Sequence, residues 1–376
     1  MKQILTLFMG FCLMFSTGCN ATGSLFANYR PIEQLKLVHT LGFDLHEDGL
    51  TLSICGGEQD GQGIVRLSAT GRNITECLDK LQDFSGKEEL YYAHTRYVLV
   101  GEDYAKQGLG DVMQYLESSN QLRSDLPLFI IKNSSAKHLM FSAGREESSI
   151  NEIMEAVMRD CAKQGKAFPF TCGDIGSFSA EYGSALACAL AVTNTKEADP
   201  DGGAQELTPL VSGYGIIRNG DLVGYLSEQA SRGVNFLINE TGTEPFTILF
   251  DGLPVSLRVT KTEPHLCPRF SKNGMIELTI ELELEATLEE TEQKAQPDPE
   301  HVAMTMESTV QQWMEEILMT MRNTETDFLG FGPRIAIAYP KMHTDSPIQW
   351  TQRMKTLPMH ATVRCSVSGG ENEPRR

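Results

Sequence analysis

Alternating apolar and polar residues predict β-strands in the first two thirds of the chain. Val38 to Phe43 and Leu50 to Cys55 are apolar runs on either side of the polar turn His46 to Gly49, a pattern typical of a β-hairpin. Further strands are predicted where residues alternate or are wholly apolar, over 64–69, 97–100, 127–131 and 185–192. Asn219-Gly220 between two apolar runs predicts a second hairpin over 214–226.

Apolar residues repeated every three or four positions predict helices between these strands. After Asn73, the residues Ile74, Cys77 and Leu81 share one face, and Glu76 makes Asn73 a typical helix cap. Ser135 is predicted to cap a short helix that ends near residue 141. Two more helices are predicted over 109–116 and 150–161. Strands that alternate with helices indicate an α/β arrangement.

The last third predicts one long strand, one long helix and a closing strand. Residues 275–289 alternate strictly, so that Ile and Leu face one way and glutamates face the other. Four of the glutamates that face this way are Glu277, Glu281, Glu283 and Glu285. After two prolines, apolar residues from Val302 to Met321 recur at helical spacing, and 361–367 alternate as a final strand.

The length of 376 residues suggests two or three domains at ~100–200 residues each. The polar stretch 144–149 marks one boundary. We therefore predict a mixed α+β protein with mixed sheets flanked by helices, divided into an N-terminal domain, a middle domain, a C-terminal domain and a disordered tail. The predicted ranges are 31–143, 144–243, 244–369 and 370–376.

The first residues predict export and lipid attachment. Lys2 precedes the apolar run Ile4 to Phe15, and three small residues precede Cys19, which is the layout of a bacterial signal peptide. This run of about 12 residues is too short for a membrane-spanning helix, which needs ~20. A diacylglyceryl group on Cys19 would give stable anchoring through two acyl chains. We expect cleavage after residue 18 and a tether over 19–30, with a plain secretory signal as the alternative.

The net charge limits the classes of partner, and the cysteine spacing limits disulfide and metal chemistry. The chain has 32 Lys and Arg against 50 Asp and Glu, a net charge of −18. An acidic surface disfavours nucleic acid and anionic lipid headgroups as direct partners, and it would keep the folded body off the membrane except where the lipid or a protein partner holds it. Seven cysteines remain besides Cys12 and Cys19, without a CxxC pair or zinc-finger spacing, so we expect mostly free thiols.

Motifs for catalysis or cofactor binding are weak. Gly213-Tyr-Gly215 enters a hairpin and not a helix, which favours a turn over a phosphate loop. The glutamates of the strand 275–289 spread over roughly 20 Å, whereas Ca²⁺ needs oxygen ligands that converge on one point. A solvated strand face, or a surface for a cationic partner, therefore fits them better than a Ca²⁺ site. His39, His46 and His94 lack metal-ligand spacing, and no GxSxG elbow is present. We therefore predict no cofactor, no metal and no enzymatic activity.

The segment from Thr324 to Gly332 combines two phenylalanines with two glycines. It fits a turn that places its aromatic side chains in the core, with glycines supplying unusual backbone angles. The alternative is an exposed aromatic loop that contacts a partner. The candidate partner contacts are therefore Glu281, Glu283, Glu285, Phe328, Gly330, Phe331 and Gly332.

Taken together and in order, several segments resemble the Ger(x)C family, the lipoprotein C-subunits of spore germinant receptors. Besides the signal and Cys19, the resemblance lies in 32–44 with its Gly42-Phe-Asp44, in Thr70-Gly71 with 78–81, in 94–102 ending in Gly101-Glu102, in 215–226, in 327–332 with Tyr339-Pro340, and in 363–367. The family implies three α/β domains and a place on the outer face of the spore inner membrane. It also implies integral-membrane partners of an A-type and a B-type.

Two other classes of protein compete with this interpretation. A lipid-anchored, extracytoplasmic solute-binding protein would have a cleft between doubly wound sheets, whereas the strands here alternate too often for mainly parallel, doubly buried sheets. An exported cell-wall hydrolase would need a carboxylate pair or a zinc set in a cleft. A non-enzymatic receptor subunit needs neither feature, so it is the hypothesis we prefer.

Overall fold

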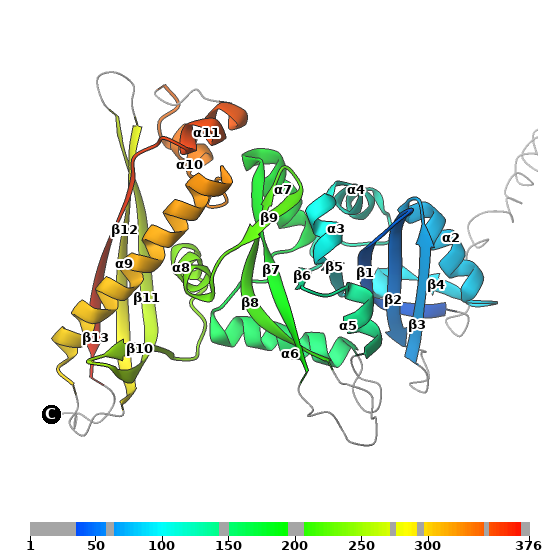
Figure 1. The fold of residues 1–376 in the computed structure, drawn as a ribbon, viewed down its shortest axis with the longest axis horizontal. Helices are drawn as coiled ribbons and strands as arrows, with labels where there is room; N and C mark the ends of the chain where they lie inside the picture. The colour runs from blue at the N-terminus through cyan, green and yellow to red at the C-terminus, as the bar shows by residue number, and fades with distance from the viewer. Residues whose placement is uncertain are drawn as a thin grey trace, which may run out of the picture.

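The computed structural model describes residues 35–57, 64–142, 150–194, 207–270, 276–291, 297–341 and 346–369. The predicted signal peptide, Cys19, the tether and the tail lie outside these residues. The described chain forms two β-sheets flanked by helices, which follow one another along the long axis of the molecule (Figure 1). This arrangement confirms the predicted α+β class.

The first sheet combines a parallel centre with antiparallel margins. Its order is β3-β2-β1-β5-β6-β7-β8-β9, with β4 beside the start of β1. Neighbouring strands pair in parallel from β1 through β5 and β6 to β7, and the outer pairs are antiparallel. The strands are β1 Leu35–His46, β2 Gly49–Gly57, β3 Ile64–Gly71, β4 Glu89–Tyr91, β5 Tyr97–Gly101, β6 Leu128–Lys132, β7 Ser184–Asn194, β8 Leu207–Arg218 and β9 Asp221–Tyr225.

Helices cover both faces of this sheet, so its central strands are buried on both sides. Val98 and Val100 of β5 lie in the core beneath α2, α3, α4 and α7, whereas Leu99 lies in the core beneath α5, α6 and α8. The expectation that strands alternate too often for doubly buried parallel pairing is therefore wrong for the centre of the sheet. The helices are α2 Ile74–Phe84, α3 Glu102–Gln107, α4 Gly110–Ser118, α5 Ala136–Ser142, α6 Ile150–Gln164, α7 Cys172–Tyr182 and α8 Glu228–Ile238, with a short 3-10 turn η2 at Tyr92–His94.

The sheet crosses the boundary that the sequence predicted near residue 143. β6 belongs to the predicted N-terminal domain and β7 to the middle domain, yet the two strands pair in parallel from Phe129 with Cys188 to Lys132 with Ala191. The polar stretch between α5 and α6 lies outside the described residues. The division of this region into two domains stays a prediction.

The second sheet belongs wholly to the C-terminal third. Its order is β10-β11-β12-β13, and the long helix α9 runs along one face (Figure 1). The alternating pattern explains this packing, since Leu282 and Leu284 of β12 are buried together with Val310 and Ile317 of α9. The elements are β10 Phe246–Phe250, β11 Leu253–Phe270, β12 Ile276–Thr291, α9 Pro299–Thr324, α10 Phe331–Ala338, α11 Pro347–Met354 and β13 Met359–Ser368.

The two sheets share one hydrophobic core where α8 crosses α9. A Cβ at Gly233 of α8 would lie only 2.8 Å from Met314 Cε, which shows how closely the helices approach. The Trp313 ring lies 6.1 Å from that of Phe236 and 5.7 Å from that of Phe246. The buried cluster therefore continues from the first sheet into the second without a break.

Candidate functional site

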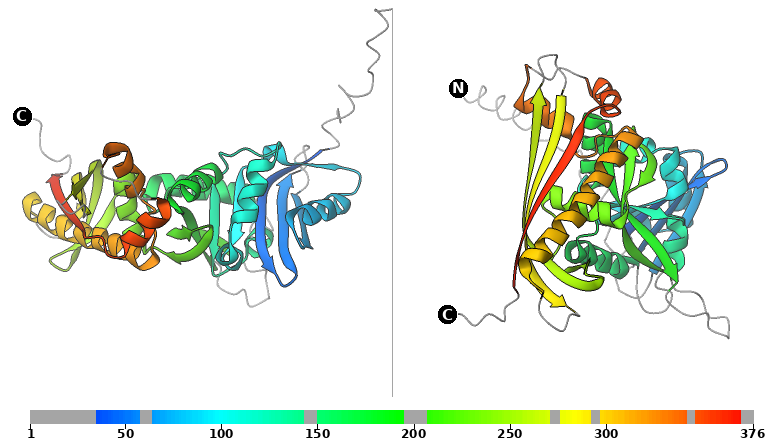
Figure 2. Two further views of the ribbon diagram at one scale, coloured as in Figure 1. Left: turned by 90° about the horizontal axis from the view of Figure 1, so that it is seen from above. Right: turned by 60° about the vertical axis from the view of Figure 1, so that its left-hand side comes forward.

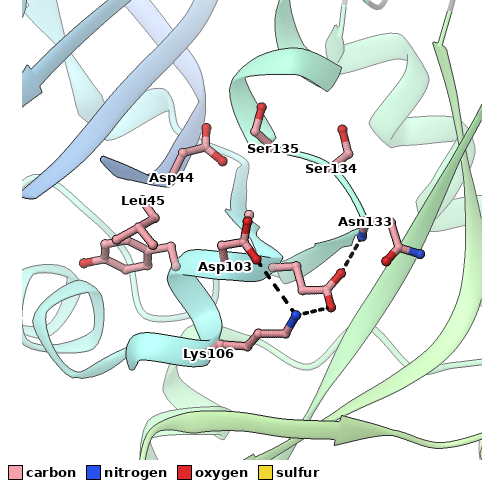
Figure 3. A pocket seen from close by; sticks show the side chains of 10 residues that line it. Asp44, Leu45, Asp103, Lys106, Asn133, Ser134 and Ser135 are labelled. Atoms are coloured by element: carbon pink, nitrogen blue, oxygen red, sulfur yellow. Dashed lines mark hydrogen bonds and ion pairs between the residues drawn. The ribbon is translucent and has the colours of Figure 1, made fainter. Parts of the chain in front are cut away.

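A polar cavity opens where β1, β5 and β6 end at the same edge of the first sheet (Figure 3). Ligands of α/β proteins often bind at the carboxyl ends of parallel strands. The cavity has a volume of about 420 Å³. It is lined by Asp44, Leu45, Gly101, Glu102, Asp103, Tyr104, Lys106, Asn133, Ser134 and Ser135.

The carboxylate of Asp44 joins β1 to the start of α5. Its Oδ1 accepts a hydrogen bond from the Ala136 N–H at 2.6 Å, and its Oδ2 accepts one from the Lys137 N–H at 2.7 Å. Burial raises the pKa of Asp44, and the two backbone N–H groups oppose that shift. Gly101 leaves room for this contact, since a Cβ there would lie 2.2 Å from Asp44 Oδ1.

The carboxylate of Glu102 binds the chain just after β6, three residues before the first of the two amides that contact Asp44. It accepts a hydrogen bond from the Asn133 N–H at 2.5 Å and forms an ion pair with Lys106 at 2.8 Å. Burial opposes ionisation of Glu102, but the contacts with Lys106 and Asn133 outweigh it and lower its pKa. Asp44 and Glu102 thus both bind the segment 133–137, which runs from the end of β6 into the start of α5 in the wall of the cavity.

These contacts indicate a structural role for the motif carboxylates. Ser134 Oγ lies 3.3 Å from His138 Nδ1, but both groups are exposed, and Asp44 contacts backbone amides and not the imidazole. A nucleophile, base and orienting acid are therefore not assembled at this loop. Within the described ranges, no group of three or more His, Cys, Asp or Glu side chains is placed to hold a metal ion.

A second buried carboxylate organises the aromatic segment near the end of α9. Asp327 is fully buried and accepts hydrogen bonds from the Phe331 N–H at 2.8 Å, the Gly332 N–H at 2.7 Å and Trp350 Nε1 at 2.7 Å. Its own N–H donates to Ser184 Oγ at 3.1 Å, which links the segment to β7 of the first sheet. Burial raises the pKa of Asp327, and the three donors oppose that shift.

The glycines of this segment fit the same arrangement. Gly330 has a φ of 68°, in the left-handed region, and packs against the ring of Tyr182. A Cβ at Gly332 would lie 2.6 Å from the Trp350 indole. Phe328 and Phe331 are buried, as the turn interpretation predicted, whereas of the two glycines only Gly330 has an unusual φ, because Gly332 lies in α10. A partner contact through these residues stays a prediction, and in this structure they are packed into the chain's own core.

Glu277, Glu281, Glu283 and Glu285 of β12 lie on the face of the second sheet opposite α9. Glu285 lies 3.3 Å from Lys261, Glu283 lies 3.2 Å from Arg364 and Glu277 lies 3.6 Å from His360. Within the described residues Glu281 forms no ion pair, and it is exposed. These four carboxylates therefore do not converge on one point. They form a face of mixed charge on which Glu281 is the carboxylate without an ion-pair partner among the described residues.

The other residues that the sequence singled out have local structural roles. Gly213 and Gly215 lie in β8, as the hairpin interpretation predicted. His39 Nδ1 lies 2.6 Å from Asn151 Nδ2. The seven cysteines of the described body are free thiols, and Cys161 and Cys188 approach to 4.0 Å between their sulfur atoms. No helix in the part of the chain that the structure describes is long and apolar enough to cross a membrane.

Sequence reasoning did not assign roles to Asp44, Glu102 and Asp327. Some of their partners are distant, such as Ala136 for Asp44 and Trp350 for Asp327. Others are local, since Lys106 and Phe331 each lie four residues after the carboxylate that they contact. The available signals were these short spacings and the position of the carboxylates in the motifs that carry the family resemblance.

Comparisons with known proteins agree with that resemblance. A family model described as the spore germination protein N-terminal domain matches residues 28–191, and one described as spore germination B3/GerAC-like, C-terminal, matches 212–370. Spore germination protein KC of Bacillus subtilis is 22% identical over 382 aligned residues, which cover 92% of each chain. The B. subtilis protein YfkR is 21% identical over 352, covering 91% of this chain and 86% of its own.

A solved structure extends the likeness to the fold. The crystal structure of the GerBC protein matches with a TM-score of 0.57 and 16% sequence identity, over 87% of this chain and 96% of GerBC. At that identity the match concerns the fold alone. The family models, in contrast, cover both halves of the described chain in order. The chain therefore belongs to the Ger(x)C family of spore germination proteins.

Proposed function

We propose that this chain is a non-enzymatic, lipid-anchored subunit of a spore germinant receptor. It would sit on the outer face of the spore inner membrane, held by a diacylglyceryl group on Cys19, beside integral-membrane partners of the A-type and B-type. Its role would be receptor assembly and transmission of the nutrient signal. Family membership along nearly the whole chain carries this proposal.

The contacts of the motif residues support a role without catalysis. Asp44, Glu102 and Asp327 are the carboxylates of the family-like motifs, and each holds backbone N–H groups of the chain itself. Buried carboxylates that are satisfied in this way fix the shape of the body. A body with a fixed shape suits a subunit that acts through its surface.

The first experiment is a pull-down from the inner membrane of dormant spores, with a tag after Arg376. We expect the A-type and B-type subunits to co-purify with the wild-type chain, and Cys19→Ala to lower their recovery strongly. Cys12→Ala is the matched control, because Cys12 lies in the segment removed with the signal. Recovery of the chain without any membrane partner would overturn the proposal.

The exposed glutamates give a test of the docking surface. We expect charge reversal at Glu281, Glu283 and Glu285 to lower the yield of the receptor complex if the β12 face contacts a cationic partner. Glu47→Lys, in the exposed turn between β1 and β2, is the control for added positive charge. Unchanged yield across the series would remove this face from the interface.

Binding of a small solute is the competing function, and the cavity beside Asp44 is the observation that favours it. A thermal-shift screen against amino acids and sugars tests it, since a ligand that binds the native state raises its stability by mass action. We expect no shift, because Asp44 and Glu102 already hold internal partners. A shift that is lost on Asp103→Ala, at the exposed rim of the cavity, would support the competing function.

A further inference from the structure

The two short helices α10 and α11 lie at one end of the second sheet (Figures 1 and 2). Each of them exposes an aliphatic side chain. Ile337 of α10 is 80% exposed and Ile348 of α11 is 71% exposed. Ile335 and Trp350, two residues away on the same helices, are buried. Residues two positions apart lie on nearly opposite sides of a helix, so both isoleucines face away from the body.

Buried contacts hold these exposed residues in place. Trp350 packs against Gly332 of α10 and donates to Asp327, which fixes α11 on the start of α10. Tyr339, which follows α10 and is 40% exposed, has its ring 5.2 Å from that of Phe270 at the end of β11. The isoleucines and Tyr339 thus belong to a packed element of the fold.

The charge of this region is opposite to that of the rest of the chain. Residues 328–369 contain five Lys and Arg and a single acidic residue, Asp345, whereas the whole chain has 32 Lys and Arg against 50 Asp and Glu. Two of the five, Lys355 and Arg364, are paired with Glu325 and Glu283. Arg334 and Lys341 are exposed beside the isoleucines in the sequence.

We propose that α10 and α11 form a second membrane contact, which binds an anionic lipid surface. Ile337 and Ile348 would enter the boundary between headgroups and acyl chains, as the apolar face of an interfacial helix does. Tyr339 suits the headgroup level, where tyrosine is enriched. Arg334 and Lys341 would face lipid phosphates, so this region is a local exception to the repulsion expected of the acidic body.

A lipid surface fits the exposed residues better than a protein partner does. The isoleucines project singly from two short helices, and a fluid bilayer can close around each of them. A stable protein interface buries about 800 Å² on each partner and requires a fitted surface. The proposal rests on the proposed anchor only because the anchor would bring the body to the membrane.

Flotation with lipid vesicles tests the proposal. The protein is the mature chain with Cys19→Ala, residues 19–376, which retains every described residue. We expect it to bind vesicles of phosphatidylcholine and phosphatidylglycerol in equal parts more tightly than vesicles of phosphatidylcholine alone. Ile337→Glu combined with Ile348→Glu should weaken binding by roughly tenfold or more. Lys341→Glu should weaken binding to the anionic vesicles only.

Leu249→Glu is the matched control, because Leu249 is 69% exposed on β10, outside this element. We expect this variant to bind like the parent, and the melting temperatures of all variants to stay close to that of the parent because the changed side chains are exposed. Equal loss in Leu249→Glu, or no binding of the parent to either vesicle, overturns the proposal.

A protein partner is the other outcome that overturns it. In that case the paired isoleucine variant would lower recovery of the A-type or B-type subunit in the pull-down, while the parent binds no vesicles. The vesicle assay contains no receptor subunit. Its failure is therefore distinguishable from failure of the receptor proposal, which the pull-down with Cys19→Ala decides.

Discussion

At the residue scale, Asp327 shows how one buried carboxylate can account for a motif. Two backbone N–H groups and the Trp350 indole donate to it, and Gly332 leaves room for that indole. Sequence spacing predicted correctly that the phenylalanines would enter the core. The donors Phe331 and Gly332 lie only four and five residues further along, but Trp350 lies 23 residues away and Ser184 lies on β7, so spacing did not indicate the full set of contacts of Asp327.

Asp327→Asn is predicted to destabilise the protein by about 2 kcal/mol or more, since buried donors would lose their acceptor. Asparagine offers one carbonyl oxygen where Asp327 uses both oxygens, so its NH₂ group would face an N–H donor. Urea unfolding followed by circular dichroism measures the change. Asp103→Asn is the control, because its side chain is 81% exposed and we expect a change within about 0.5 kcal/mol. Equal stability of both variants would contradict this account.

Glu76 gives a prediction on pH at the start of α2. Hydrogen bonds from Lys80 and from the N–H and side chain of Arg72 lower the pKa of Glu76 to about 2. A folded-state pKa below the ordinary 4.5 stabilises the fold above pH 4.5, and this contribution is lost as pH falls towards 2. We expect the Glu76 carboxyl carbon to titrate near 2 by NMR, and Lys80→Met to raise that value. A titration near 4.5 in the wild-type chain would show that the exposed contacts are not maintained in solution.

At the element scale, a regular apolar periodicity was enough to predict a strand or a helix, whereas an irregular pattern was not. The strands and helices predicted from alternation or helical spacing are present, with Asn73 and Ser135 as the predicted caps. The sequence did not predict β11, which contains Pro264 and Pro268. β10 pairs only with Leu253–Leu257, so the rest of β11 has one free edge, where proline is tolerated.

Helix α7 was missed for a different reason. Its two glycines weaken the helical pattern, yet Thr171 and Asp174 form a capping box that marks its start. That signal was present in the sequence and could have been used. The continuous pairing of β6 with β7, in contrast, depends on residues more than fifty positions apart and has no local signature.

The free edge of β13 is covered by side chains of α9. Gln311 donates to the Ala361 carbonyl at 2.8 Å, and Glu307 accepts from the Cys365 N–H at 2.9 Å. Exposed strand edges invite pairing with another chain. We therefore predict that Glu307→Ala combined with Gln311→Ala lowers stability by about 1–2 kcal/mol and increases self-association in sedimentation velocity. Gln312→Ala, at the exposed neighbouring position, should do neither, and a monomeric double variant would contradict the role in edge protection.

At the scale of the whole molecule, one continuous hydrophobic core joins the two sheets. Trp313 of α9 contacts Phe236 of α8 and Phe246 of β10, and Asp327 binds Ser184 of β7. These contacts leave the two sheets joined by packed side chains and by one buried hydrogen bond. Local sequence patterns predicted most strands of the first sheet, and β12, β13 and α9 of the second, but not the contact between the sheets, since its residues come from three distant segments.

The packed contact between the two sheets leads to a prediction of how the protein unfolds. Because one core spans both sheets, we expect wild-type unfolding to give one calorimetric transition whose calorimetric and van't Hoff enthalpies agree. Trp313→Ala removes the ring between Phe236 and Phe246 and should cost about 3 kcal/mol. The loss falls on the contacts between the sheets, so we expect the single transition to separate into two. Met304→Ala is the control, because Met304 lies on the same helix and is 60% exposed. A single transition in Trp313→Ala, shifted to lower temperature, would mean that the Asp327–Ser184 contact and the remaining core couple the sheets without Trp313.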